Sequence, residues 1–503
     1  MSEHFDVVVV GAGISGIGAG YFLQRDCPDR SYVILEGRER LGGTWDLFRY
    51  PGIRSDSDMY TLGYSFRPWT QAKAIADGPS ILRYLEETVR DHGIDRHIRH
   101  QHRVVAASWS TADARWTISV ERGADAAPVE FTCNFLFMCS GYYNYAAGYL
   151  PDFAGRDRFR GEIVHPQQWP QHLDYAGKRV VVIGSGATAV TLVPEMARTA
   201  AQVTMLQRSP SYIVARPSED GIANWLRAKL PARLAYRLTR IKNVALGQFF
   251  YRLARRKPDK VRARLIDMVR DELGPDYDVA THFTPSYNPW DQRLCLVPDA
   301  DLFAAIREGR ATVVTGHIAA FEKDGVRLES GELVPADVIV TATGLDMQLM
   351  SGIPFTVDGR RVDPAQSLGY KAMMYSDIPN LASAFGYTNA SWTLKSDLTA
   401  AYVARLLNTM KKRGMRQVTP RLGGDVKPEP FLTFTSGYIQ RAKDKFPRQG
   451  DRKPWRVHQN YGLDLLALKF GGVDEGMEFS NPRPAADAPV SGSNGPVAVS
   501  GRR

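Results

Sequence analysis

The chain has 503 residues, 44% hydrophobic and 23% charged, which is typical of a globular protein with several domains. Its four cysteines have no C-x-x-C spacing, which argues against a disulfide framework, a dithiol redox centre and a metal site. No apolar run is long enough to span a bilayer and no secretion signal is visible, so we expect a cytoplasmic protein, while the net charge of +10 alone identifies no partner.

A strand followed by a glycine turn begins the chain. Residues 5–10 form a continuous run of the buried parallel-strand type, and Gly11, Gly13 and Gly16 follow with G-x-G-x-x-G spacing. Such a turn lets the backbone approach a pyrophosphate at a helix N-terminus. Glu36 ends the next strand-like run, where a carboxylate accepts hydrogen bonds from a ribose and repels a 2′-phosphate. This unit therefore predicts an FAD site; the alternative is a solvated glutamate at a strand end.

A second unit of the same kind begins at residues 178–183, and its next strand covers residues 203–206. No acid follows that strand, and an arginine there can hold a 2′-phosphate with two hydrogen bonds. The second unit therefore predicts an NADPH site, unless this arginine is one more surface residue of a basic chain. Its candidate residues are Gly184, Ser185, Gly186, Ala187, Thr188, Ala189, Gln207, Arg208 and Ser209.

The segment from about 218 to 282 has apolar residues at helical spacing and is strongly basic. Residues 225–270 contain fourteen Lys/Arg but only two acidic residues, Asp259 and Asp267. Two interpretations remain open: a solvated helical subdomain that caps the substrate pocket, or a helical face that rests on an anionic membrane. We find no motif for nucleic-acid binding, and the oligomeric state leaves no signal in the sequence.

Two longer motifs resemble the signatures of type I Baeyer–Villiger monooxygenases, within the flavin-containing monooxygenase superfamily. Residues 42–56, GGTWDLFRYPGIRSD, match the longer signature at every fixed place, and residues 159–170 match the shorter one, F-x-G-x-x-x-H-x-x-x-W-P. Nearly the whole chain to about residue 480 resembles mycobacterial FAD-containing members that act on thioamides, including residues 287–293 and 386–395.

The resemblance implies an α/β fold with two Rossmann-like dinucleotide-binding domains and a helical insertion. The FAD-binding domain would comprise 1–149 and 345–480, and the NADPH-binding domain 150–215 and 293–344. The helical subdomain would be 216–292. The final stretch, 481–503, is rich in Pro, Ala, Ser and Gly and is predicted to be disordered.

The resemblance also assigns roles to single residues. Asp56 is the family's active-site carboxylate near the nicotinamide, and Arg293 is its essential arginine. The FAD site would include Ser15 at the pyrophosphate and Val104 at the adenine, with Thr44, Trp45, Asp46 and Leu47 along the flavin. Arg54 and Ser55 belong to the NADPH site. The shorter signature lies in the interdomain linker, where His165 and Trp169 resemble hinge elements, and its fixed residues are Phe159, Gly161, His165, Trp169 and Pro170.

The implied reaction consumes NADPH and dioxygen and inserts one oxygen atom into a small ketone through a C4a-peroxyflavin, which gives an ester or lactone. Sulfur in thioamides and sulfides is a second implied substrate. Many relatives have a lysine directly before the essential arginine, but here Gln292 occupies that place, which leaves Arg208 as the main phosphate anchor. The alternative within enzymes is an N-hydroxylating flavin monooxygenase, whose signature normally ends in another aromatic than the Trp-Pro found here.

Overall fold

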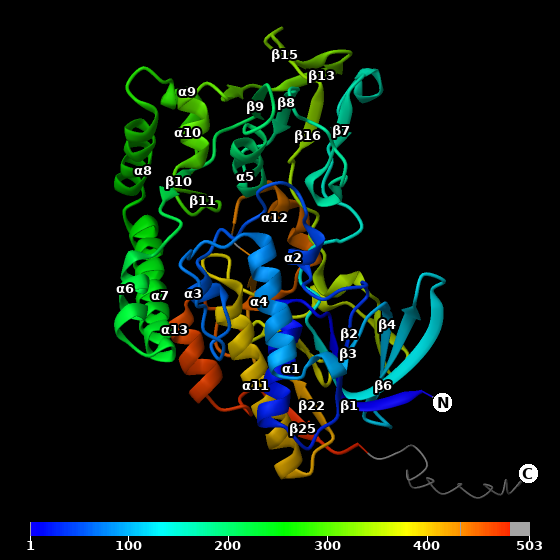
Figure 1. The fold of residues 1–503 in the computed structure, drawn as a ribbon. Helices are drawn as coiled ribbons and strands as arrows, with labels where there is room; N and C mark the ends of the chain where they lie inside the picture. Colours follow the sequence, from blue (N-terminus) through cyan, green and yellow to red (C-terminus); the bar gives the residue numbers. More distant parts are fainter. Residues whose placement is uncertain (1, 433, 483–503) are drawn as a thin grey trace, which may run out of the picture.

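The computed structural model describes residues 2–432 and 434–482, which form two α/β domains, each built on its own sheet (Figure 1). The larger sheet has nine strands, in the order β18-β17-β4-β5-β6-β1-β2-β3, with β21 also paired to β6. Its core is parallel, since β1 pairs in parallel with both β2 and β6. Its strands are β1 (Glu3–Val10), β2 (Tyr32–Leu35), β3 (Ile98–Arg99), β4 (His102–Ser110), β5 (Arg115–Arg122), β6 (Ala127–Met138), β17 (Phe355–Val357), β18 (Arg360–Val362) and β21 (Leu381–Ser383).

Three long helices lie beside this sheet, and two of them, α1 and α11, pack against each other although they lie far apart in the sequence (Figure 1). Helix α1 follows the first glycine turn directly. The helices are α1 (Ile14–Asp26), α4 (Gly78–Asp91) and α11 (Trp392–Arg413).

The second sheet has five parallel strands in the order β12-β9-β8-β16-β7. Helices α5 (Ala187–Met196) and α10 (Asp301–Arg307) share one core with it, and a small antiparallel sheet packs on its other face through a separate core. The strands are β7 (Glu162–Val164), β8 (Arg179–Ile183), β9 (Gln202–Gln207), β12 (Ala311–Thr315) and β16 (Val338–Thr341), and the small sheet contains β13 (Ile318–Glu322), β14 (Gly325–Leu328) and β15 (Leu333–Pro335).

The apolar runs of the sequence are the buried centres of these sheets. Val7, Val8 and Val9 in β1 are 0% exposed, as are Val181 and Val182 in β8. Parallel strands covered on both faces need apolar side chains at every position, which explains why these runs are continuous rather than alternating. The predicted fold class, two Rossmann-like domains with a helical insertion, is confirmed.

The helical insertion contains α6 (Gly221–Lys229), α7 (Ala232–Arg256) and α8 (Pro258–Leu273), which lie together along one side of the molecule (Figure 1). Helix α7 packs on α3 (Met59–Leu62), where its Arg240 donates hydrogen bonds to the carbonyls of Tyr60 and Gly63. Among the described helices, none has both the length and the apolar character needed to cross a membrane.

A buried ion pair attaches the C-terminal segment to the first domain. Lys395 on α11 lies 2.8 Å from the carboxylate of Asp464 at the end of α13 (Tyr461–Asp464), and both side chains are nearly inaccessible. Tyr387 donates a hydrogen bond of 2.7 Å to the same carboxylate. Burial lowers the pKa of Lys395 while Asp464 opposes that shift, so each charge depends on the other. The predicted tail lies outside the described residues from position 483 onward.

We expect Lys395→Met to lower the free energy of unfolding by about 3–5 kcal/mol, because it leaves the Asp464 carboxylate buried without its cation. Chemical unfolding followed by circular dichroism measures this loss. The control is Lys412→Met on the exposed face of the same helix, which should change the free energy by less than about 0.5 kcal/mol. Equal stabilities of the two variants would contradict the anchoring role.

Candidate active site

One large cavity, of about 1300 Å³, lies where the carboxyl ends of the two parallel sheets face each other. Both glycine turns line it, together with segments from many distant parts of the chain. Pockets for a single small ligand usually measure about 300–1,000 Å³. The volume therefore fits more than one bound molecule.

The first glycine turn is shaped by close backbone contacts. Gly11 has φ +101°, and a Cβ there would lie 2.8 Å from the carbonyl oxygen of Cys139. A Cβ at Gly16 would lie 1.8 Å from the carbonyl oxygen of Gly11, so only glycine lets α1 approach β1. Gly13 precedes α1 and faces the cavity, which places the positive end of the helix dipole there.

Glu36 lies at the carboxyl end of β2, where the sequence predicts a ribose-binding acid. Its carboxylate is 6% exposed and accepts hydrogen bonds from the backbone N–H groups of Ala12, at 2.7 Å, and Arg38, at 2.9 Å. Burial raises the pKa of Glu36, while these two donors oppose the shift. Each carboxylate oxygen keeps a second lone pair for a ligand in the cavity.

Two polar atoms of this region have no hydrogen-bond partner among the described residues. Arg38 Nη1 and Ser140 Oγ are buried, and both residues line the cavity next to the first turn. Buried polar groups are almost always hydrogen-bonded in folded proteins. These two atoms and the Glu36 carboxylate therefore fit a polar ligand bound beside the first turn.

The second glycine turn has the same shape. Gly184 has φ +138°, and a Cβ there would lie 2.4 Å from the carbonyl oxygen of Ala342. Gly186 precedes α5 and has open space where a Cβ would project, while Ala189 is buried at the third position of the motif. The residues of the turn that line the cavity are Gly184, Ser185, Gly186, Ala187 and Thr188.

The residues after β9 differ in where their side chains lie. Arg208 and Ser209 line the cavity and are exposed, and within the described ranges Arg208 has no carboxylate within salt-bridge distance. Gln207 is 1% exposed and donates hydrogen bonds to the backbone carbonyl of His282 and the hydroxyl of Thr315, neither of which lines the cavity. Arg208 is thus available to an anionic ligand, whereas Gln207 has its donors engaged elsewhere.

Arg293 and Asp56 meet across the cavity although 237 positions separate them. Arg293 Nη1 lies 3.4 Å from Asp56 Oδ2, and each side chain is 38% exposed to the cavity. Burial opposes the charge on Arg293, but Tyr142, Tyr438 and Asp56 outweigh it and raise its pKa. The structure therefore has a fixed cation in the same cavity as both turns.

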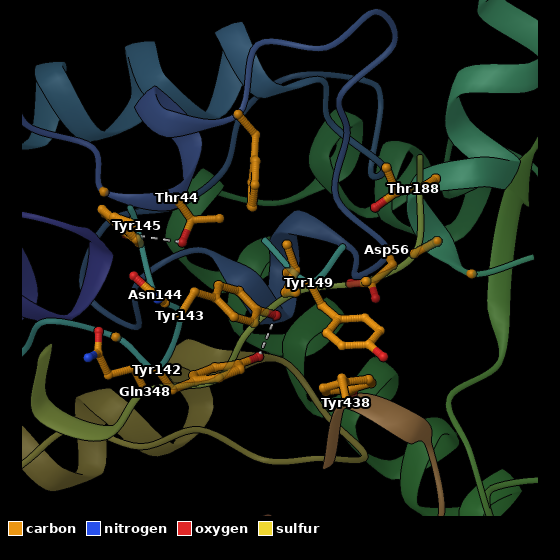
Figure 2. A pocket seen from close by; sticks show the side chains of 18 of the residues that line it. Thr44, Asp56, Tyr142, Tyr143, Asn144, Tyr145, Tyr149, Thr188, Gln348 and Tyr438 are labelled. Atoms are coloured by element: carbon orange, nitrogen blue, oxygen red, sulfur yellow. Dashed lines mark hydrogen bonds between the residues drawn. The ribbon is translucent and has the colours of Figure 1, made fainter. Parts of the chain in front are cut away.

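Several aromatic residues that line the cavity were not predicted from the sequence. Figure 2 shows Tyr142 and Tyr143 joined by a hydrogen bond between their hydroxyls, of 2.9 Å, with Tyr149 and Tyr438 on the side toward Asp56. Tyr142 stacks on Trp392, whose indole N–H donates to the Ser15 hydroxyl. The run 142–145 directly follows β6, so its place at the carboxyl edge of the sheet was a usable signal. Trp392 and Tyr438 carry no such signal.

Some predicted site residues do not line the cavity: Gly16, Asp46, Leu47, Ala189 and Gln207. The Asp46 carboxylate is instead held by Arg38, Arg40 and Arg49, at 2.6–3.2 Å. The other predicted FAD and NADPH residues do line it: Gly11, Gly13, Ser15, Glu36, Thr44, Trp45, Asp56, Val104, Arg54, Ser55, Gly184, Ser185, Gly186, Ala187, Thr188, Arg208 and Ser209. Of these, Arg54 donates hydrogen bonds to the Asp301 carboxylate from its two terminal nitrogens, Nη1 and Nη2.

The interdomain fingerprint lies outside the cavity lining. The ring of His165 covers Gly148, where a Cβ would lie 2.0 Å from it, and burial lowers the pKa of His165. Gly161 has no room for a side chain, because a Cβ there would lie 2.1 Å from a backbone carbonyl oxygen. The remaining residues pack in the second domain or lie on its surface: Phe159, Trp169 and Pro170.

The structure gives no support to one of the two interpretations of the helical insertion, that it caps the substrate pocket. Residues 212–291 contribute nothing to the cavity lining. The helices pack against α3 and against β10 (Ile213–Arg216).

Comparison with known proteins decides the family. A family profile described as flavin-binding monooxygenase-like matches residues 74–253, and one for an NAD(P)-binding Rossmann-like domain matches residues 9–77. The FAD-containing monooxygenase EthA of Mycobacterium tuberculosis is 54% identical over 96% of this chain and 99% of its own length. The chain belongs to the FAD-containing monooxygenases. The probable FAD-binding monooxygenase AlmA of Acinetobacter baylyi is 48% identical to this monooxygenase over 95% of the chain.

Solved structures share the fold of this monooxygenase. An oxidised steroid monooxygenase bound to NADP has a TM-score of 0.74 at 23% identity, and an open form of cyclohexanone monooxygenase has 0.71 at 20%. Each comparison covers 95% of this chain and all of the other. At such identities the likeness concerns the fold, and it agrees with the two-domain architecture seen here.

We expect Glu36→Ala to lower FAD affinity about 10- to 100-fold, because it removes the buried acceptor at the end of β2 and frees two backbone donors. Flavin content after dialysis, read from its absorbance, measures the loss. Glu39→Ala, three residues further along and exposed, is the matched control. Full flavin retention in Glu36→Ala would remove Glu36 from the FAD site.

Proposed function

We propose that this monooxygenase uses NADPH and dioxygen to convert ketones to esters or lactones, and that it also oxidises sulfur in thioamides and sulfides. The observation that carries the proposal is the Arg293–Asp56 pair, which lies in one cavity with both glycine turns. One oxygen atom enters the product, the other leaves as water, and NADPH provides the two electrons.

The chain offers separate places for the two coenzymes. The first turn, Glu36 and the unpartnered Arg38 nitrogen would hold FAD, and the second turn with Arg208 would hold NADPH. Bound together, flavin and nicotinamide supply the hydride transfer and oxygen activation that no side chain can provide. Glu36 and Arg208 have opposite charges at equivalent strand ends, which supports assigning the 2′-phosphate to the second site.

Arg293 would stabilise the negative charge that develops on oxygen during its transfer to the carbonyl carbon. A guanidinium keeps its charge at any pH near neutrality, and a fixed charge acts more strongly where water is excluded. The contact with Asp56 is longer than a strong charge-assisted hydrogen bond of about 2.8 Å. Asp56 would therefore orient Arg293 without locking it, which lets the cation serve the reductive and the oxidative step from two positions.

We expect Arg293→Ala to retain FAD and NADPH oxidation but to lose at least about 100-fold in product formation, because it removes the only charge proposed to act on oxygen. Product is measured by gas chromatography of ketone, sulfide and amine incubations, alongside NADPH consumption. Arg361→Ala, an exposed arginine at the far edge of the large sheet, is the control.

Normal ester formation by Arg293→Ala would exclude the guanidinium from the reaction. Hydroxylamine from amines, with no ester or sulfur oxide from the wild-type enzyme, would instead establish the N-hydroxylating alternative.

We expect Arg208→Ala to raise the KM for NADPH by about 10- to 100-fold and to leave the KM for NADH nearly unchanged, since only NADPH has the 2′-phosphate. Steady-state flavin reduction with each coenzyme gives both values. Arg198→Ala, exposed after α5 in the same domain and paired with Glu195, is the control. Equal increases for both coenzymes would contradict the phosphate-anchor assignment.

A further inference from the structure

The outer face of the helical insertion carries large apolar side chains in water. On α7 they recur three to eight positions apart, which places them along one line of the helix, called here the apolar stripe: Leu234, Leu238, Ile241 and Phe249, 45%, 40%, 66% and 59% exposed. Exposed Ala245 fills the gap in this line. Along the first half of the helix the opposite face is buried, through Ala235, Tyr236, Thr239 and Arg240.

The neighbouring helix α6 extends this surface. Ile222 and Trp225 on α6, which packs against α7, are 58% and 61% exposed. Leu463 and Leu466 in and just after α13 are also exposed, but Tyr461 at the start of α13 contacts Arg240 on the buried face of α7, so these two leucines are separate from the stripe. Figure 1 shows α6, α7 and α13 on the same side of the molecule. Isolated exposed apolar residues are ordinary in soluble proteins, but a row of this length marks an interaction surface.

Arginines border the apolar stripe. Arg252 and Arg256 follow Phe249 on the same line of α7, and Arg233 and Arg237 lie beside its first half. All four are exposed. In the described part of the insertion, the salt bridges involve other basic residues, namely Arg240, Lys242, Arg255, Arg264 and Arg270. The border of the stripe is therefore a set of uncompensated positive charges.

We propose that this face is a docking surface for an anionic lipid membrane, with the apolar stripe at the level of the headgroups and the arginines on the lipid phosphates. An apolar face with a basic border is what a helix lying in such an interface requires. A second copy of the chain would oppose this face with its own arginines, and a nucleic acid would leave the aliphatic side chains in water. Because residues 212–291 do not line the cavity, docking leaves the active site unobstructed and does not depend on the proposed reaction.

The test is flotation of the FAD-loaded, full-length enzyme with vesicles of phosphatidylcholine containing about one third phosphatidylglycerol, compared with pure phosphatidylcholine. We expect binding to the anionic vesicles at low salt, weaker binding at high salt, and little binding to the neutral ones. Ile241→Ser/Phe249→Ser and Arg237→Glu/Arg252→Glu should each lower the partition coefficient at least about tenfold.

Two control variants make the same kinds of substitution elsewhere on the protein surface. Arg360→Glu/Arg361→Glu makes the same charge change on exposed β18, and Leu422→Ser removes an apolar side chain that is 42% exposed elsewhere. Both should bind like the wild type, and all variants should keep wild-type flavin content. The proposal is overturned if the wild type does not bind anionic vesicles, or if the stripe variants and the controls bind equally well. It is also overturned if sedimentation shows that the stripe forms the interface between two copies of the chain.

Discussion

The hydrogen bonds between the two interdomain linkers are the constraint on which the active-site cavity depends. Tyr149 donates its backbone N–H to the carbonyl of Gly344, and the Thr343 hydroxyl donates to the carbonyl of Tyr149, at 3.0 and 2.6 Å. The chain crosses between the domains at both points, so these bonds fix where one sheet faces the other. His165 closes over Gly148 beside them, and this contact is so tight that the first linker has no space for a side chain at that position.

From that constraint the chemistry of the cavity follows. Each turn alone is an ordinary dinucleotide site, with a helix N-terminus directed at phosphate. Facing each other, they surround one space in which Arg293 from the second domain meets Asp56 from the first. A flavin-dependent monooxygenase needs the flavin and its reductant in one space, and only the joined domains bring the two dinucleotide sites together.

The sequence predicted the fold well because its strongest signals are local. Continuous apolar strands and glycine turns depend on neighbouring residues, and β2 ends at Leu35, directly before Glu36, as expected. The contact between Arg293 and Asp56 could be predicted only from the family resemblance, since no local sequence pattern links positions so far apart. Trp392 and Tyr438 were missed for the same reason. The surroundings of Asp46 could not be predicted either, because its position in the motif does not indicate that three arginines surround its carboxylate.

The carboxylate of Asp464 has one more consequence. It accepts a hydrogen bond from the hydroxyl of Tyr387, a residue of the cavity wall, and forms a buried ion pair with Lys395. An aromatic side chain tethered at its far end cannot swing aside to admit a larger molecule. The cavity wall at Tyr387 is therefore preorganised. Ligands that fit its existing shape bind without the cost of rearranging it, whereas ligands that need a wider cavity are disfavoured.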